Sequence, residues 1–293
     1  MSDIALSVPR AITRRSARTR RMLSLAGWSA CAVAFVLVAL PVFDILFLVI
    51  SRGLAAFSPA LFTQVTNGTS GGLANAISGT LILSAGALLF GVPVGVGGGI
   101  YLAEFGNGRF GAIVRFVADV LTGIPSIVLG YFAYITLITG LGWHFSVLAG
   151  SVTLAIIIIP YMARLTELVL RQVPQSLREA AYALGAPERK VILRVVFPIG
   201  WPGILTSILL ALAISVGETA PLIYTAGWSN YMWHGKLIGE PIGYLTYVIW
   251  SFINQPAASA HALAFAAGFL VIVTVLAINI AARLVLRRTG GGQ

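Results

Sequence analysis

The chain has 293 residues, of which 58% are apolar and only 10% are charged. Soluble globular proteins carry about 25% charged residues and disordered chains are poor in apolar ones, so both classes are excluded. The net charge of +10 suggests nucleic-acid binding only until the basic residues are placed along the chain. We therefore expect an integral membrane protein with several spans.

The chain begins with a basic segment, residues 1–24, followed by the first apolar stretch, residues 25–50. This stretch is longer than the apolar core of a signal peptide, so we predict an uncleaved first span. The single cysteine, Cys31, allows neither an internal disulfide nor a thiolate metal site.

Six stretches are long and apolar enough to cross a membrane as helices, and their apolar residues are continuous rather than alternating. They are residues 25–50, 73–102, 113–139, 145–170, 202–226 and 262–286. The expected fold is an all-α membrane protein in which residues 25–288 form one six-span domain and residues 289–293 a flexible tail. In the second span, Gly91, Gly95 and Gly99 have the four-residue spacing typical of close helix packing.

The basic residues alternate between the two sides of this predicted topology. Seventeen Lys and Arg residues fall on the side of the two chain ends and two on the other side. This imbalance predicts that both termini are cytoplasmic, and it explains the net charge without nucleic acid.

Several polar groups lie within or beside the third and fourth spans. Pro125 and Ser126 interrupt the third span, where they indicate either a kink or a substrate contact. Asp119 follows Arg115 by four residues, and Glu167 follows Arg164 by three, spacings that favour local ion pairs on a helix.

The loop at residues 172–201 contains the signals of two short helices. Ser176 and Glu179 have the spacing of a capping box, with Ser176 as the N-cap. Gly185 is placed to end the first helix, and Pro187 to begin the second, which Pro198 is expected to stop. The small side chains of this loop suit either a docked partner or a packed segment without one.

The fifth span carries the most prominent intramembrane charge, Glu218. Ser207, Ala211 and Ser215 precede it at helical spacing and form a small, polar stripe that faces either the translocation path or a helix packing interface. Beside an anion, Glu218 is expected to hold a basic group or to be neutral rather than to act as a ligand.

No motif for ATP hydrolysis or other catalysis is present in the sequence. The three histidines, His144, His234 and His261, fall in segments far apart and are interpreted as surface residues rather than metal ligands. We expect no catalytic residue, metal or cofactor in this chain, so any ATP-Mg would be bound by a partner.

The loop resembles the signature of the permeases of ABC importers. That signature combines E-A-A, a glycine and an apolar-proline anchor, which here are Glu179-Ala180-Ala181, Gly185 and Val195-Val196-Phe197-Pro198. The resemblance implies a type I importer permease in which Ser176 to Gly185 form the coupling helix that docks on a separate ATPase subunit.

Four further stretches resemble the phosphate-importer permeases. They are residues 75–81, 101–104, 123–130 and Gly217-Glu218-Thr219-Ala220-Pro221, and the last is typical of the A-type (PstA-like) subunit. The resemblance implies a plasma (inner) membrane location, phosphate as the substrate, a second (C-type) permease, a pair of ATPase subunits and an extracytoplasmic phosphate-binding protein. Some members of that family carry an arginine a few residues before the glutamate, where this chain has Ile214, Ser215 and Val216.

The expected translocation path therefore draws its positive charge from Arg164 or from the partner permease. The residues expected along the path are Ser126, Arg164, Ser215, Glu218 and Thr219. Alternatives are a permease for another oxyanion such as molybdate or sulfate, a gradient-driven carrier or channel, and a membrane scaffold that reports phosphate status to a sensor kinase.

Overall fold

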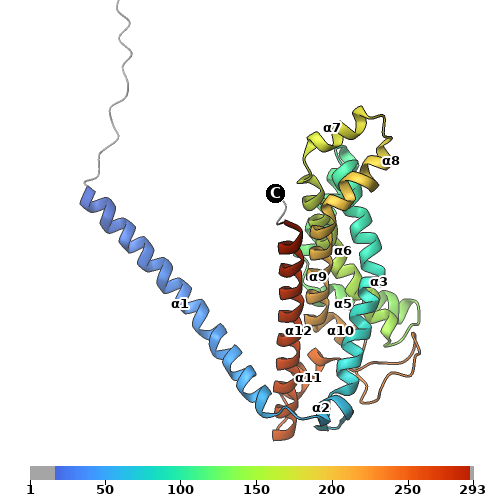
Figure 1. Cartoon of the computed structure of the whole chain (residues 1–293). Helices are drawn as coiled ribbons and strands as arrows, with labels where there is room; N and C mark the ends of the chain where they lie inside the picture. The colour runs from blue at the N-terminus through green and yellow to red at the C-terminus, as the bar shows by residue number, and fades with distance from the viewer. Residues whose placement is uncertain (1–16, 291–293) are drawn as a thin grey trace, which may run out of the picture. The chain divides into compact units, whose positions relative to one another are not determined.

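The computed structural model describes residues 17–290, and the side chains of residues 18–285 (Figure 1). The chain divides into two compact units, residues 1–48 and residues 49–293. Most of the predicted basic segment 1–24 and the end of the predicted tail lie outside the described residues. The first helix, α1 (Ala17–Ala55), runs from the first unit into the second.

The second unit is almost entirely helical. Its elements after α1 are α2 (Ala60–Thr63), β1 (Thr66–Asn67), β2 (Ser70–Gly71), α3 (Ala74–Glu104), α4 (Arg109–Gly123), α5 (Ser126–Ala133), the π-helix η1 (Tyr134–Gly140), α6 (Val147–Arg171), α7 (Gln175–Ala183), α8 (Glu188–Val191), the π-helix η2 (Ile192–Val196), α9 (Phe197–Gly217), α10 (Ala220–Thr225), α11 (Leu245–Phe252) and α12 (Ala258–Gly290). The two strands form a small antiparallel hairpin in which Thr66 pairs with Gly71.

The described residues contain five helices long and apolar enough to cross a membrane, or six if a bent pair is counted as one span. That pair is α4 with the α5–η1 segment, and its two halves meet at 100°. The predicted continuous span 113–139 is therefore wrong in its middle. Ile124 and Pro125 both have extended backbone angles, because proline lacks an N–H and disfavours helical geometry in the residue before it.

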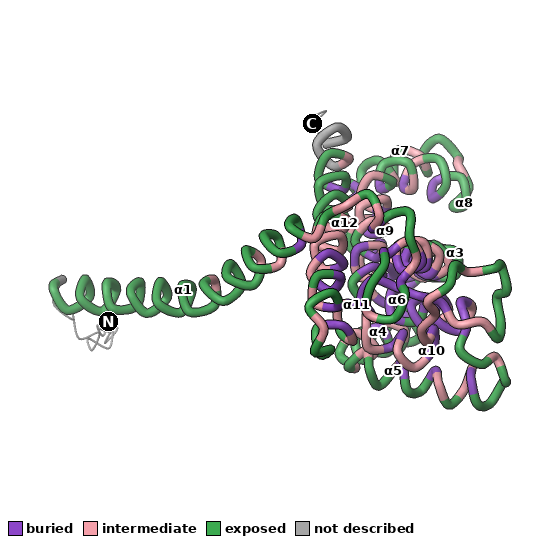
Figure 2. The backbone as a smooth tube through the Cα atoms, turned by 90° about the horizontal axis from the view of Figure 1, so that it is seen from below, coloured by how far each residue is buried: buried purple, intermediate pink, exposed green. Residues whose placement is uncertain are grey.

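The core lies where α3, α6 and α9 meet, and α6 is the central helix (Figure 2). In the most apolar stretch of α6, 67% of the residues are buried, whereas in that of α12 only 28% are buried. A second buried cluster joins α11 to α12 and the start of α3, and a third joins α6, α8 and α9. The apolar side chains left exposed on α12 are therefore available to lipid or to another subunit.

The glycine spacing in α3 has the packing role predicted for it. A Cβ atom at Gly95 would lie 2.7 Å from the Cβ of Met162, and one at Gly99 would lie 2.4 Å from the Cβ of Thr166. At Gly91 it would lie 2.9 Å from Ile158. Only glycine therefore lets α3 and α6 approach so closely.

The fifth span differs from its prediction at both ends. It begins at Glu188 and runs without interruption through η2 to Gly217, so Pro198 lies inside the helix instead of stopping it. The wider π-helical turn of η2 shifts the hydrogen-bond pattern by one residue just before Pro198, where the proline N–H is missing. At the other end the helix stops at Gly217 and resumes as α10 at Ala220, so the predicted continuous span 202–226 is broken near its end.

Candidate functional site

The segment between α6 and α9 forms two short helices, α7 and α8, at one end of the bundle (Figure 1). The predicted capping box is wrong. The N-cap of α7 is Pro174, whose extended backbone starts the helix two residues earlier, and Ser176 lies inside the first turn without a capping bond. Pro187 is likewise the N-cap of α8 rather than its first residue.

The turn between the two helices depends on Gly185, as predicted. Gly185 has φ +76°, a left-handed conformation that favours glycine, and no atom outside its neighbours lies within 4 Å of where a Cβ would be. The N–H of Gly185 donates to Tyr182 O (2.9 Å), and that of Ala186 to Ala181 O (3.1 Å). These two bonds close the carboxyl end of α7.

Helix α7 exposes apolar side chains instead of burying them. None of its residues is buried, and Leu184, just after its last residue, is 88% exposed. Leu177 and Tyr182 are also exposed. Of the residues predicted to couple the chain to a partner, Ser176, Glu179, Ala180, Gly185 and Pro198 are exposed and Ala181 is partly buried. Such a surface suits docking by another protein better than contact with water.

One ion pair fastens α7 to the rest of the bundle. Arg178 pairs with Glu104, the last residue of α3, and it also donates to Leu170 O at 2.8 Å. The two side chains are 13% and 8% exposed. This pair therefore links α7 directly to a helix of the bundle core.

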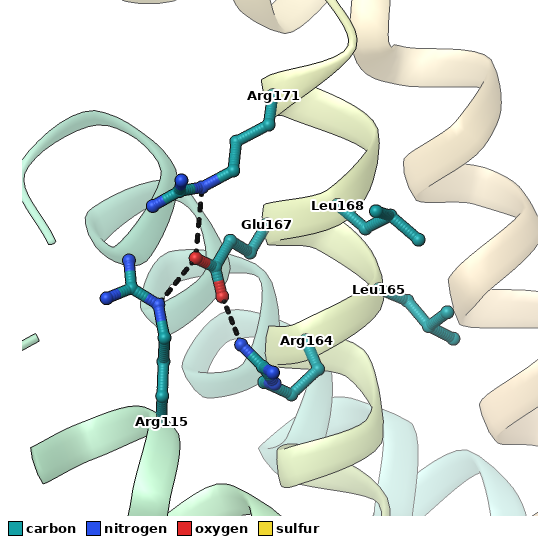
Figure 3. Close-up of a pocket in the computed structure, with 6 residues that line it drawn as sticks. All are labelled: Arg115, Arg164, Leu165, Glu167, Leu168 and Arg171. Carbon is teal, nitrogen blue, oxygen red and sulfur yellow. Dashed lines mark hydrogen bonds and ion pairs between the residues drawn. The ribbon is translucent and has the colours of Figure 1, made fainter. Parts of the chain in front are cut away.

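A group of three arginines surrounds the carboxylate of Glu167 on α6 (Figure 3). Glu167 contacts Arg115 from α4 at 2.7 Å, Arg164 at 2.8 Å and Arg171 at 3.0 Å. Its side chain is only 5% exposed, and the three arginines are 23% to 46% exposed. The arginines and Glu167 line a cavity of about 450 Å³ in which basic groups exceed acidic ones.

The ion pairs of this cluster follow the sequence prediction only in part. Arg164 and Glu167 pair as predicted. Arg115 does not pair with Asp119, because its guanidinium turns to Glu167 and to the carbonyl oxygens of Leu102 (2.9 Å) and Gly106 (2.8 Å). Asp119 pairs instead with Arg164, at 3.0 Å.

Two helix breaks lie side by side in the bundle, one before Ser126 and one at Glu218. The Glu218 side chain contacts the Ser126 hydroxyl, and a Cβ at Gly130 would lie 2.4 Å from the Cα of Pro221. The carbonyl of Glu218 accepts a hydrogen bond from the Thr246 hydroxyl at 2.7 Å. Breaks of this kind place polar backbone and side-chain groups within a membrane, where they can contact a passing solute.

The predicted polar stripe of the fifth span is divided by this break. Ser207, Ala211 and Ser215 are buried against the rest of the chain, as in the packing interpretation. Glu218 does not continue their helical face, because its backbone is extended, and both Glu218 and Thr219 are partly exposed. Whether any of them faces a translocation path stays a prediction.

Sequence reasoning missed the partners of Glu104 and Arg115. Both residues lie near the ends of apolar stretches, on the side where 17 of the 19 basic residues were expected. A carboxylate among so many arginines signals an ion pair. The choice of partner depends on how the helices pack.

Comparison with known proteins identifies the type of chain. Residues 95–291 match the family described as binding-protein-dependent transport system inner membrane component. This chain belongs to that family. The match covers more than half of the chain and includes the Glu167 cluster, α7, α8 and the Glu218 break.

Two relatives of this inner membrane component share most of its length. The phosphate transport system permease protein PstA 2 of Mycobacterium tuberculosis (strain CDC 1551 / Oshkosh) is 45% identical over 281 residues, which are 96% of this chain and 92% of the relative. The phosphate transport system permease protein PstA of Yersinia pestis is 44% identical over 245 residues, 82% of each chain.

Solved structures place the inner membrane component in the fold of type I ABC importer permeases. A bacterial ABC transporter involved in the import of the acidic polysaccharide alginate matches with TM-score 0.59 and 17% identity, over 92% of this chain and 96% of that one. The inward-facing MetNI methionine ABC transporter matches with TM-score 0.57 and 20% identity, over 73% and 97%. At these identities the likeness supports the fold alone.

Proposed function

We propose that this chain is a transmembrane permease subunit of an ATP-driven phosphate importer. The observation that carries the proposal is the 45% identity over 96% of the chain with a phosphate transport system permease protein. The four sequence stretches that resemble phosphate-importer permeases support the same substrate.

In this proposal α7 is the coupling helix. ATP-Mg is bound and hydrolysed by a separate pair of ATPase subunits, on which the exposed face of α7 docks. The buried pair between Arg178 and Glu104 carries the movement of α7 into α3. The importer is completed by a second permease of the C type and by a phosphate-binding protein on the external side.

The translocation path passes the two adjacent helix breaks. Ser126, Glu218 and Thr219 lie at these breaks and are partly exposed. Glu218 contacts a hydroxyl rather than a basic group, so it is suited to position the break and not to bind an anion. Positive charge is supplied by Arg164 and its neighbours or by the second permease, since Ile214, Ser215 and Val216 supply none.

Orientation in the plasma (inner) membrane follows from the distribution of charge. The end of the bundle that carries α7, Arg171 and Arg178 is cytoplasmic by the positive-inside rule. The residues from α4 to η1 pass from the Glu167 cluster to the opposite end, where Gly239 N–H bonds to Trp143 O. If α4 to η1 count as one crossing, the chain has six spans and both termini are cytoplasmic. Fusions of alkaline phosphatase or a fluorescent protein to each terminus test this orientation.

Uptake of radiolabelled phosphate at limiting phosphate tests the substrate. A strain that lacks this gene and has no other phosphate importer is compared with the same strain carrying the wild-type gene. We expect uptake to be lost and then restored. If phosphate uptake is unaffected while molybdate or sulfate uptake is lost, the chain is an oxyanion permease of different specificity.

A substitution at the helix break tests the proposed path. Glu218→Gln keeps the size of the side chain but removes its charge, and we expect it to impair uptake while the subunits still co-purify. Glu188→Gln, whose side chain is exposed at the start of α8, is the matched control and is expected to retain uptake. Unchanged uptake by the Glu218 variant would remove this residue from the path.

A further inference from the structure

A second basic site lies at the opposite end of the bundle from α7, where the last turns of α1 meet the first turns of α12. Both segments belong to the second compact unit. The contact is close, because a Cβ at Gly53 would lie 2.5 Å from the Cβ of Phe269. The rings of Phe57 and Phe269 also pack in a T-shaped arrangement, with centroids 6.1 Å apart. The side chains at this crossing are therefore held in defined positions.

A cavity of about 330 Å³ opens beside this crossing. It is lined by Arg52, His261, Phe265 and four alanines. The guanidinium carbon of Arg52 lies 5.3 Å from the centroid of the Phe265 ring, a cation–π contact that restrains an otherwise exposed side chain. The cavity thus combines a fixed guanidinium and an imidazole with an apolar floor.

The charge of Arg52 is not compensated by an acidic side chain. Within residues 18–285, no carboxylate forms an ion pair with Arg52. The first turn of α12 contains no acidic residue, and the amino-terminal end of this long helix adds a partial positive charge. The site is therefore suited to an anion, and the planar guanidinium is suited to a phosphate group.

The surroundings indicate that the phosphate group is held by a lipid. Arg52 lies two residues after the end of an apolar run of α1, and His261 directly precedes that of α12. The cavity therefore lies at the level where helices leave the hydrocarbon. Ile50 and Leu54 on either side of Arg52 are 38% and 53% exposed. An acyl chain can cover these apolar side chains while its headgroup occupies the cavity.

We propose that the cavity between α1 and α12 binds the phosphate ester of an anionic glycerophospholipid. This site is distinct from the Glu167 cluster and independent of the substrate that the importer carries. Its role is to hold the end of α1 against α12 at the membrane surface.

Native mass spectrometry of the full chain in detergent tests the site. Phosphatidylglycerol is added in increasing amounts to the wild type, to Arg52→Gln and to the matched control Arg189→Gln on α8. We expect apparent lipid affinity to be about tenfold weaker in Arg52→Gln and unchanged in the control, because one charge-assisted contact to phosphate is lost. Equal lipid retention by the wild type and Arg52→Gln would overturn the proposal.

Two further measurements identify the ligand and control for misfolding of the Arg52 variant. Excess inorganic phosphate is expected to leave the lipid bound, and displacement of the lipid would assign the cavity to the free anion instead. His261→Gln gives a second measurement if Arg52→Gln fails to elute as a single species in size-exclusion chromatography. We expect weaker lipid retention for this variant too, and unchanged retention would exclude the cavity.

Discussion

Arg178 of α7 and Glu104 of α3 form a largely buried ion pair, although 74 residues separate them in the chain. In the proposed importer this pair connects the helix that contacts the ATPase with a helix of the bundle core. It also leaves little freedom for α7 to move alone. The pair is therefore the first place to test how the two parts are coupled.

Reversing one charge of this pair should uncouple transport, and reversing both should restore it. Glu104→Arg or Arg178→Glu leaves two like charges together, and breaking a buried pair costs about 3 kcal/mol. We expect each single variant to lose most phosphate uptake and the double variant to regain a large part. Lys236→Glu, an exposed residue in the loop before α11, is the charge-reversal control, and equal uptake by all four variants would contradict the role of the pair.

Glu167 is expected to stabilise the fold more than Asp119 does, although both pair with Arg164. The Glu167 side chain is 5% exposed and contacts three arginines, so its loss leaves several positive charges close together. The Asp119 side chain is 58% exposed. We expect Glu167→Gln to lower the free energy of unfolding by about 3 kcal/mol and Asp119→Asn by less than about 1 kcal/mol.

Thermal unfolding of the purified chain in detergent, followed by intrinsic fluorescence, checks this difference. The melting temperature of Glu167→Gln should fall clearly below that of Asp119→Asn. Similar melting temperatures would mean that the three arginines do not depend on this carboxylate.

Two neighbouring glycines of α3 offer a matched test of helix packing. A Cβ at Gly99 would lie 2.4 Å from the Cβ of Thr166, whereas no such atom lies within 4 Å at Gly97. Gly99→Ala should destabilise the chain by about 1–3 kcal/mol through overpacking. Gly97→Ala should be neutral or stabilising by about 0.5–1 kcal/mol, because alanine favours a helix. Melting temperatures in the reverse order would exclude close packing at Gly99.

The loop between α10 and α11 should loosen in acid. Hydrogen bonds from His234, whose ring Nδ1 lies 2.7 Å from Glu240 Oε1, hold the pKa of the Glu240 carboxyl below its usual value of 4.5. A lowered pKa stabilises the folded loop at any pH above this usual value. That stabilisation is lost as the pH falls through the lowered pKa, when the carboxylate takes up a proton.

Hydrogen exchange of the His234 amide, which donates to Glu240 Oε1 at 3.2 Å, reports this change. After correction for the intrinsic exchange rate, its protection should decrease as the pH falls below about 4.5. Glu240→Gln should show low protection throughout. Constant protection in the wild type across this range would show that the carboxylate does not hold the loop.

The extent to which the sequence predicted this site differed from residue to residue. Gly185 and the glycines of α3 were found because a left-handed turn and a four-residue spacing leave a local signal. Ser176 was misplaced as an N-cap because Pro174 starts α7 two residues earlier, and helix ends often shift by a residue or two. Pro198 was misread because the π-helical turn directly before it lets the helix continue past a residue that lacks an N–H.

The sequence by itself determined where the apolar helices lie, which segment carries the helix–glycine–helix turn and which side holds most of the positive charge. These are local or additive properties, since they follow from the length and composition of each stretch. Tertiary structure alone decided that the third span bends by 100° at Pro125, that Glu218 meets Ser126 and that Arg115 pairs with Glu167. The reason is physical: a buried charge or a broken helix takes whichever partner the packing brings within a few ångströms. Here the partners of Arg115 and Arg178 lie 52 and 74 residues away in the chain.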